Sequence, residues 1–341
     1  MIQAVTSSPP LAALVCAAAL MAVGLMLPDW VLFTASLALA KGLVVLGLVL
    51  LLRMGAVSFG QGMYYCLGAY ICGLVGNATG VQDALFLVIL SGLGCCVLGA
   101  VLGVFLSAYR GVFFAMFNLA LSMILYGALL KATSVGGSDG IGIAPPSYFG
   151  LSPSDEYRSI LFYAFVVVVA AVVGLATRIY MRSELGLAAL AVRDNEIRLE
   201  YLGLSVRRVI VFNYAIAAGL AGLGGGLVAL VSGHIIPEFA YWTTSGEFVF
   251  MTVLSGPSSI IAAFGATALF ETVRLVAGQY LPNAWQLMLG AFLLLSILFL
   301  PNGIGALAAG RRRTDAEAPD DPPPSAAGDG AETPNAKEDA R

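Results

Sequence analysis

Charged residues and histidine are scarce in this sequence. Asp, Glu, Lys and Arg together make up 11% of the 341 residues, hydrophobic residues make up 59%, and the mean hydropathy is +0.91. These values exclude an ordinary soluble globule and indicate an all-α, polytopic integral membrane protein. The five cysteines form no Cys-x-x-Cys pair, and His234 is the only histidine. We therefore expect no metal site and no disulfide, with the cysteines acting as small buried hydrophobic residues.

Lysine is equally rare, and none of the lysines follows a glycine. The phosphate-binding loop with the pattern GxxxxGK[ST] is therefore missing, so we do not expect this chain to bind ATP by itself. The sequence shows no nucleophile–base set and no metal cluster, which argues against an integral membrane enzyme with catalytic residues of its own. We expect no cofactor and no nucleic-acid partner.

The few charges are concentrated in two places. Residues 311–341 hold thirteen charged side chains, and residues 178–208 hold ten more. The segment 311–341 lacks apolar periodicity and is rich in Pro, Ala and acidic residues, so we expect a disordered acidic C-terminal tail. That tail alone accounts for the net charge of −3. Residues 1–310 are expected to form the transmembrane domain, with a cytoplasmic segment at residues 182–208.

Apolar stretches recur along the chain, and a helix needs about 20 such residues to cross the hydrocarbon core. The eighth predicted helix is short because the sequence LSGPSS at residues 254–259 breaks it. Such a break survives at membrane depth only where it is buried or lines a cavity. The prediction is about ten transmembrane helices, short or broken ones included, at residues 11–27, 31–52, 58–76, 84–107, 112–131, 159–181, 209–232, 246–256, 260–278 and 284–300.

The distribution of Arg and Asp orients these helices. Arg53 and Arg110 fall on the same side of the membrane as residues 182–208, whereas Asp29 and Asp83 fall on the other side. By the positive-inside rule, the N-terminus and the segment 182–208 are cytoplasmic. A run of three arginines after the last predicted helix places the C-terminus on the cytoplasmic side as well.

The polar segment 182–208 has the composition of a folded helical elbow. Leu, Ala, Arg and Glu favour helix formation. Asp194 is placed to cap a second short helix, Gly203 suits the end of that helix, and Ser205 suits the start of the next. One side of the elbow is apolar and has nothing obvious in this chain to cover it, which favours a cytoplasmic partner over a merely solvated connector. That side consists of Leu185, Ala188, Ala189, Val192, Leu199 and Leu202.

Five short motifs occur along the chain. They are Gly55-Ala56-Val57-Ser58-Phe59-Gly60-Gln61-Gly62 with Gly68-Ala69-Tyr70, Arg110-Gly111-Val112-Phe113-Phe114-Ala115, Gly136-Gly137-Ser138-Asp139-Gly140, Ala191-Val192-Arg193-Asp194-Asn195-Glu196 with Gly203, and Ala217-Ala218-Gly219-Leu220-Ala221-Gly222. Each motif alone is a weak signal, but five in this order are specific. Over roughly residues 35–305 the chain resembles the permease subunits of branched-chain amino acid ABC importers.

The resemblance implies an importer subunit in the bacterial inner (plasma) membrane that moves branched-chain or related amino acids. It implies four partners: cytoplasmic ATP-binding subunits, a second permease subunit that is a homologous but different chain, a soluble periplasmic substrate-binding protein, and membrane lipid. Residues 1–310 would be its transmembrane permease domain. Because selectivity in this family lies largely with the binding protein, the exact substrate stays open between a branched-chain or other amino acid, urea, a short amide and a small aromatic acid. Whether the two permease chains are identical or different also stays open.

The resemblance also assigns the elbow as the coupling segment that rests on an ATP-binding subunit. From the residues alone, capping and intrahelical pairing explain the same side chains, and a helix end alone explains the glycine. The expected coupling residues are Arg193, Asp194, Asn195, Glu196 and Gly203.

A translocation path requires polar side chains inside the membrane, where an unpaired polar group is costly. Ser58 and Gln61 are such residues, and Asn118 and Ser122 lie four positions apart, hence on one face of a helix. Close packing is the alternative role for all of them, and tyrosine is more often a core residue than a ligand. The candidate path residues are Ser58, Gln61, Tyr64, Asn118, Ser122 and Lys41.

Lys41 is the one cation well inside a predicted helix. An intramembrane lysine is functional by default, or else it snorkels or pairs with Glu247 or Glu271. The competing hypothesis for the whole chain is a self-contained secondary transporter or channel for a small polar solute, which also uses broken helices. Such proteins usually couple the flux to titratable groups or cation ligands in the membrane, and this chain has few. That scarcity and the elbow favour the ATP-driven permease.

Overall fold

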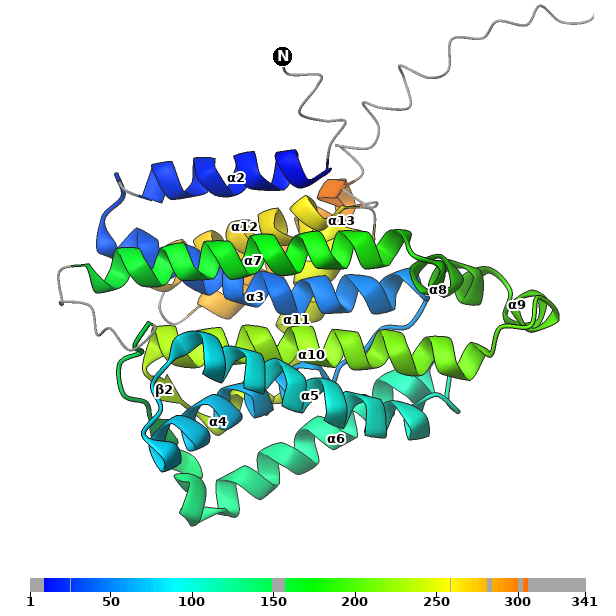
Figure 1. Cartoon of the computed structure of the whole chain (residues 1–341), viewed down its shortest axis with the longest axis horizontal. Helices are drawn as coiled ribbons and strands as arrows, with labels where there is room; N and C mark the ends of the chain where they lie inside the picture. Colours follow the sequence, from blue (N-terminus) through cyan, green and yellow to red (C-terminus); the bar gives the residue numbers. More distant parts are fainter. Residues whose placement is uncertain are drawn as a thin grey trace, which may run out of the picture.

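The computed structural model describes residues 9–24, 26–148, 157–257, 259–280, 284–299 and 303–305, and the protein is all-α apart from one two-residue strand pair. In this part of the chain ten helices form a bundle, and two short helices stand at one end of it (Figure 1). The bundle helices are α2 (Pro9–Gly24), α3 (Asp29–Arg53), α4 (Gln61–Thr79), α5 (Ala84–Leu106), α6 (Gly111–Lys131), α7 (Arg158–Arg182), α10 (Val206–Ser232), α11 (Trp242–Ser255), α12 (Ile260–Tyr280) and α13 (Trp285–Phe299). The short ones are α8 (Glu184–Asp194) and α9 (Glu196–Tyr201). The predicted tail 311–341 lies outside the described residues.

The ten predicted helices are confirmed, and the chain is a polytopic membrane protein. Among the described helices, six are long and apolar enough to cross a membrane, namely α3, α5, α6, α7, α10 and α12. Helix α11 has only 14 residues and ends at Ser255, where Gly256 adopts a φ of +75°. Helix α12 then begins at Ile260. The predicted break between the short eighth helix and the next one is therefore confirmed.

The start of α4 differs from the prediction. The helix was expected from residue 58 but begins at Gln61, after a non-helical segment at residues 54–60. Gly55 in this segment has a φ of +81°, which glycine adopts without strain. The segment leads back into the bundle, since neither Ser58 nor Gln61 has any exposed surface. The physical reason for the later start is that the Ser58 hydroxyl accepts a hydrogen bond from Gly60 N at 3.2 Å, which favours a turn over a helix here.

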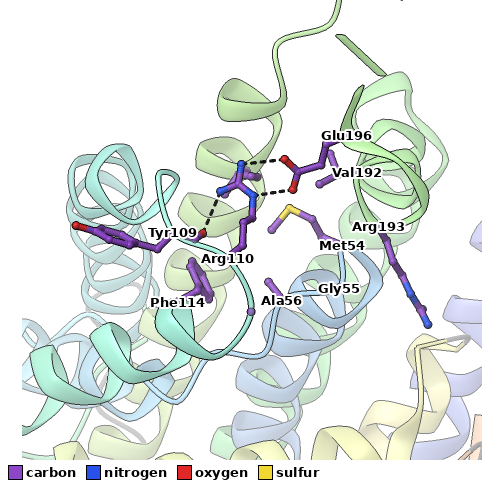
Figure 2. A pocket seen from close by; sticks show the side chains of 11 residues that line it. Met54, Gly55, Ala56, Tyr109, Arg110, Phe114, Val192, Arg193 and Glu196 are labelled. Atoms are coloured by element: carbon purple, nitrogen blue, oxygen red, sulfur yellow. Dashed lines mark hydrogen bonds and ion pairs between the residues drawn. The ribbon is translucent and has the colours of Figure 1, made fainter. Parts of the chain in front are cut away.

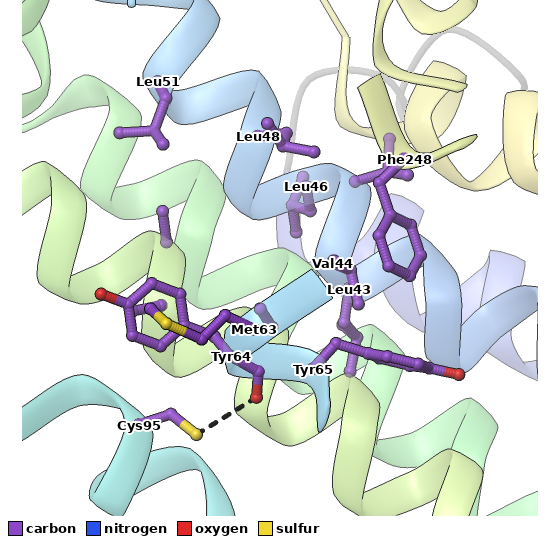
Figure 3. Packing of buried hydrophobic residues seen from close by; sticks show 14 of the residues in the cluster. Leu43, Val44, Leu46, Leu48, Leu51, Met63, Tyr64, Tyr65, Cys95 and Phe248 are labelled. Carbon is purple, nitrogen blue, oxygen red and sulfur yellow. Dashed lines mark hydrogen bonds between the residues drawn. The ribbon is translucent and has the colours of Figure 1, made fainter. Parts of the chain in front are cut away.

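Helix α10 runs through the middle of the bundle and packs against α5, α3 and α4 (Figure 1). A Cβ atom at Gly225 would lie 1.9 Å from the Tyr65 carbonyl oxygen, and a Cβ at Gly68 would lie 2.3 Å from the Gly222 carbonyl oxygen. No larger residue fits at these distances, so the backbones of α10 and α4 touch directly. Large buried side chains surround this contact, including Leu46, Tyr64, Tyr65 and Phe248 (Figure 3).

A small strand pair lies at the end of the bundle opposite α8 and α9. Strand β1 (Ile141–Gly142) pairs antiparallel with β2 (His234–Ile235), which directly follows α10. Short 3-10 turns flank the pair: η1 (Thr133–Val135), η2 (Gly137–Asp139) and η3 (Pro237–Ala240). The glycine-rich motif at 136–140 therefore forms a turn, as its composition indicates.

A buried ion pair joins α3 to α12. Lys41 Nζ lies 2.6 Å from Glu271 Oε1, and their side chains are 10% and 4% exposed. Of the two partners that the sequence allowed, Glu271 is the correct one, because Glu247 lies 2.8 Å from Arg274 instead. A buried charge that loses its partner is strongly destabilising, whereas an apolar pair of similar size is often tolerated.

We expect Lys41→Met to lower the free energy of unfolding by about 3–5 kcal/mol, because it leaves the Glu271 carboxylate buried and unpaired. The double variant Lys41→Met/Glu271→Leu should recover most of this loss. Thermal unfolding of the purified protein in detergent measures both effects. Arg274→Gln is the control, because its ion pair is more exposed. A single Lys41→Met variant as stable as wild type would contradict a structural role for the pair.

Candidate functional site

The elbow forms two helices with identifiable caps. Ser183 precedes α8 and its hydroxyl accepts from Gly186 N, and Asn195 Oδ1 accepts from Arg198 N at 3.0 Å to cap α9. The expectation that Asp194 caps the second helix is therefore wrong. Asp194 is still helical, as the last residue of α8, so the side-chain oxygen of the next residue, Asn195, supplies the cap. Gly203 follows the end of α9 with a φ of +83°, as predicted.

Four of the six residues on the predicted apolar side of the elbow are covered by this chain, contrary to the prediction. Ala188, Ala189, Val192 and Leu199 are buried in the hydrophobic core of this chain. The reason is the fold: α8 folds back against α7, α10 and α3, which the local sequence pattern cannot reveal. The other two members of the predicted side, Leu185 and Leu202, are exposed at 37% and 73%, as expected. Further apolar side chains on and after α9 and on the outer side of α8 are exposed as well, namely Leu187, Ile197, Tyr201 and Leu204, with Tyr201 at 88% exposure.

A cavity of about 370 Å³ lies beside the elbow (Figure 2). Three of the sequence motifs meet there although they are far apart in the chain. Gly55 and Ala56 of the first motif, with the adjacent Met54, follow the end of α3. Arg110, Gly111 and Phe114 of the second motif, with the adjacent Tyr109, lie at the start of α6. The elbow motif contributes Val192, Arg193 and Glu196, and Ile210 of α10 completes the lining.

A charged pair stands at this cavity. Arg110 Nε lies 2.6 Å from Glu196 Oε1, and Nη2 donates to Oε2 at 3.3 Å, so the contact is bidentate. Nη1 of the same guanidinium donates to the carbonyl oxygens of Tyr109, at 3.0 Å, and of Ser107. The side chains of Arg110 and Glu196 are 43% and 40% exposed. Residues 193–196 were predicted to face a partner, so the pairing of Glu196 within the chain is a feature that sequence reasoning missed.

The other elbow residues point elsewhere. The Arg193 side chain extends away from the Arg110–Glu196 pair (Figure 2) and packs beside Gly55, where an added Cβ would meet the Arg193 Cγ at 3.2 Å. Asn195 is occupied in capping. Arg207, just after the elbow, donates to the Ser107 hydroxyl at 3.3 Å and to the Val104 carbonyl at 3.1 Å. The end of α5 and the turn between α5 and α6 are thus connected to the elbow at Glu196 and to Arg207, just after the elbow.

Three of the candidate path residues lie around a buried hydrogen-bonded chain inside the bundle. The Tyr64 hydroxyl donates to the Tyr214 hydroxyl at 3.1 Å, and the Tyr214 hydroxyl donates to Asn118 Oδ1. Asn118 Nδ2 donates to the Phe114 carbonyl at 2.8 Å. Gln61 lies next to this chain, because a Cβ at the preceding Gly60 would be 2.9 Å from Asn118 Oδ1. Tyr214, on α10, was missed because nothing in the local sequence distinguishes it from a core tyrosine.

Gln61 is the unusual member of this set. Its side chain has no exposed surface, and neither Nε2 nor Oε1 has a hydrogen-bond partner among the described residues. The neighbouring amide of Gly62 donates to the Ser245 hydroxyl at 3.1 Å. A buried amide without partners costs about 1–3 kcal/mol. Such a group marks a position where another polar molecule can be accommodated.

The remaining candidates lie apart from this chain. The Ser122 hydroxyl donates to the Ala240 carbonyl at 2.7 Å and so ties α6 to η3. Lys41 is engaged with Glu271 at the contact between α3 and α12. Within the described residues, no group of three or more His, Cys, Asp or Glu side chains is placed to hold a metal ion. Cys66, Cys72 and Cys95 are buried in the core.

Comparison with known proteins gives consistent results. A sequence profile of the family described as "Branched-chain amino acid transport system / permease component" matches residues 30–298. The high-affinity branched-chain amino acid transport system permease protein LivM of Escherichia coli (strain K12) is 29% identical over 275 residues, which cover 73% of this chain and 64% of LivM. The permease protein LivH of the same kind of system in Salmonella typhimurium is 24% identical over 265 residues, covering 74% and 86%. This chain thus spans less than two thirds of the length of LivM. No solved structure shows a significant match.

We expect Asn118→Leu to lower the free energy of unfolding by about 1–3 kcal/mol, because it removes the only recorded acceptor of the buried Tyr214 hydroxyl among the described residues. Thermal unfolding of the purified protein measures the change. Thr272→Val is the control: its hydroxyl is exposed and donates within its own helix. Equal stability of the two variants would show that the buried chain contributes nothing to the fold.

Proposed function

Since this chain belongs to the family of permease components of branched-chain amino acid transport systems, we propose that it is the membrane subunit of an ATP-driven importer. In this proposal a separate ATP-binding subunit supplies the energy, and a second, homologous permease chain completes the membrane part. A soluble periplasmic protein delivers the substrate. Residues 1–310 form the permease domain and residues 182–208 its coupling segment.

The observation that carries the proposal is the elbow at one end of a bundle matched by the family profile. Helix α9 projects at that end and exposes Ile197, Tyr201 and Leu202 around its short length. Apolar side chains presented in this way are typical of a surface that docks on another protein. We assign the coupling residues Arg193, Asp194, Asn195, Glu196 and Gly203 to this segment, extended by the three exposed side chains.

The elbow also provides a route for mechanical coupling. Four residues separate the end of α9 from the start of α10, which runs through the centre of the bundle. Closure of two ATP-binding subunits would move the paired elbows, and the helices attached to them would rock between two arrangements open to opposite sides. The positive-inside rule makes the elbow end cytoplasmic in the inner membrane, with both termini on that side.

The path for the substrate is proposed to pass Ser58, Gln61, Tyr64, Asn118 and Ser122; Lys41, the sixth candidate, is engaged with Glu271 instead. All five are fully buried, so the described arrangement is closed at this level. Polar groups that are bonded to one another can exchange partners with a passing zwitterion. A conducting path needs such weak polar contacts rather than a deep binding cage. The permease relatives are named for branched-chain amino acids, and we propose this substrate class or a related amino acid here.

For the elbow, we expect Arg193→Ala and Glu196→Ala to lower substrate-stimulated ATP hydrolysis while the permease still inserts into the membrane. Tyr201→Ser should weaken docking more directly, since truncating a central interface tyrosine costs about 2 kcal/mol, roughly thirtyfold in affinity. Tyr280→Ser is the matched control, because Tyr280 is 76% exposed but lies outside the elbow. Co-purification of the ATP-binding subunit from gentle detergent, followed by mass spectrometry, measures docking.

Normal coupling in all three elbow variants would count heavily against the assignment. A chain that purifies alone and moves solute into liposomes without ATP would support a self-contained transporter instead.

For the path, we expect Ser58→Leu and Gln61→Leu to slow ATP-driven uptake in reconstituted vesicles without disturbing assembly, because each removes a polar contact at the level where the path is closed. Gln286→Leu is the matched control: it is the same substitution at an exposed position on α13. Uptake at the wild-type rate in both path variants would indicate that Ser58 and Gln61 serve in packing and do not line the path.

A further inference from the structure

We propose that the cavity beside the elbow binds a free zwitterionic amino acid with an apolar side chain. In this site the Arg110 guanidinium takes the α-carboxylate, the Glu196 carboxylate takes the α-ammonium, and the apolar lining takes the side chain. The chemistry of the ligand follows from the cavity itself. Its identity as the product of transport, released on the cytoplasmic side, rests on the proposed function.

The charged groups at the cavity match an amino acid head group. Arginine presents a planar fork of donors that fits a carboxylate bidentately. In the described arrangement that fork holds Glu196 through Nε and Nη2, with Nη1 anchored on the carbonyl oxygens of the α5–α6 turn. A zwitterion inserted between the two side chains replaces one carboxylate with another at Arg110. Its ammonium satisfies Glu196, so neither charge loses a partner.

Apart from Tyr109 and from Arg193, whose side chain extends away from the pair (Figure 2), the remaining lining matches an apolar side chain. Phe114, Val192 and Ile210 are buried at 2%, 6% and 3% exposure and close the inner part of the cavity. Met54 and Ala56 add further apolar surface from the end of α3. The volume of about 370 Å³ falls within the usual range of roughly 300–1,000 Å³ for small-molecule sites. A polar side chain on the ligand would meet no partner on this inner wall.

Both charges of the pair remain accessible, which distinguishes it from the Lys41–Glu271 pair. Arg110 and Glu196 are 43% and 40% exposed, so their mutual attraction is screened and easily exchanged. A second cavity, lined by Asp29 and Arg158 among others, also carries both signs of charge, but its volume is only about 130 Å³. Of these two cavities, the larger one combines an exchangeable pair with room for a side chain.

Occupancy of this site would be linked to the position of the elbow. Glu196 is the first residue of α9, and the contact with Arg110 ties α9 to the α5–α6 turn. A ligand between the two must separate them, and so it favours a different position of α9. By thermodynamic linkage, the factor by which the ligand changes the affinity of the elbow for a partner equals the factor by which that partner changes the affinity of the cavity for the ligand.

The test measures binding of L-leucine to the purified full-length chain in lipid nanodiscs, without ATP-binding subunit or binding protein, by isothermal calorimetry and thermal shift. Two analogues dissect the head group: 4-methylpentanoate lacks the ammonium and isoamylamine lacks the carboxylate. We expect L-leucine to bind and each analogue to bind at least about tenfold more weakly, because each loses a charge-assisted contact. L-Serine, with a polar side chain, should also bind more weakly.

Variants of the chain locate the site. Arg110→Gln and Glu196→Gln should each weaken L-leucine binding at least about tenfold, and Ala56→Leu should do so by filling the cavity. Glu247→Gln is the matched control, since its ion pair with Arg274 lies outside the cavity. If Arg110→Gln does not fold, the analogue series on the wild-type chain still tests the head-group assignment.

Three results would overturn the proposal: no binding of L-leucine at millimolar concentration, equal binding of 4-methylpentanoate, or binding that survives Arg110→Gln and Ala56→Leu. The last result would place the ligand elsewhere, for example beside Gln61. The proposed function fails separately, through loss of ATP-binding-subunit co-purification or ATP-driven uptake. If the chain binds L-leucine in this cavity but recruits no ATP-binding subunit, the binding-site proposal is supported and the proposed importer function is contradicted.

Discussion

The direct backbone contact between α10 and α4 is the constraint on which the rest of the structure depends. Glycine at residues 68 and 225 lets the two helices touch without side chains between them. This contact brings the Tyr64 hydroxyl within reach of Tyr214 and holds the start of α4, with Gln61, inside the bundle. The same α10 begins just after the elbow. One helix therefore carries Tyr214, the middle member of the buried hydrogen-bonded chain, in its body and follows directly on the elbow.

The strengths of the two main ion pairs indicate which contacts are fixed and which can change. Lys41 and Glu271 are buried, and separating them would expose each charge to an apolar surrounding at a cost of several kcal/mol. That pair acts as a permanent link between α3 and α12. Arg110 and Glu196 are partly exposed, where an ion pair contributes about 0–1 kcal/mol. A partner protein or a ligand can therefore exchange this contact, while the bundle behind it stays intact.

The sequence predicted the fold well because its signals are local. Hydrophobic length defines each helix, and the Gly256-Pro257 pair ends α11 where expected. The later start of α4 escaped detection because it depends on the Ser58 hydroxyl bonding to Gly60 N, a choice between two local structures of similar composition. The buried apolar side of α8 was misjudged for a different reason. Its cover comes from α3, α7 and α10, and a helical pattern shows that a face is apolar but not what lies against it.

The candidate site was predictable in part, and the limit is again long-range contact. Polar residues inside predicted helices identified Gln61 and Asn118, because polar groups there are rare. Tyr214 and the pairing of Arg110 with Glu196 join segments about 90 residues or more apart, and no periodicity reports such contacts.

Phe114 connects the two regions of polar groups. It lines the elbow cavity, its carbonyl accepts from Asn118, and its ring packs edge-on against Tyr214 at 5.8 Å. A path from the buried polar chain to the cavity must displace this ring. Reversing a two-state equilibrium from 1:99 to 99:1 takes only about 5.5 kcal/mol. The exposed Arg110–Glu196 pair, at about 0–1 kcal/mol, cannot supply that free energy by itself, so in the proposed function the docked ATP-binding subunit has to supply the rest.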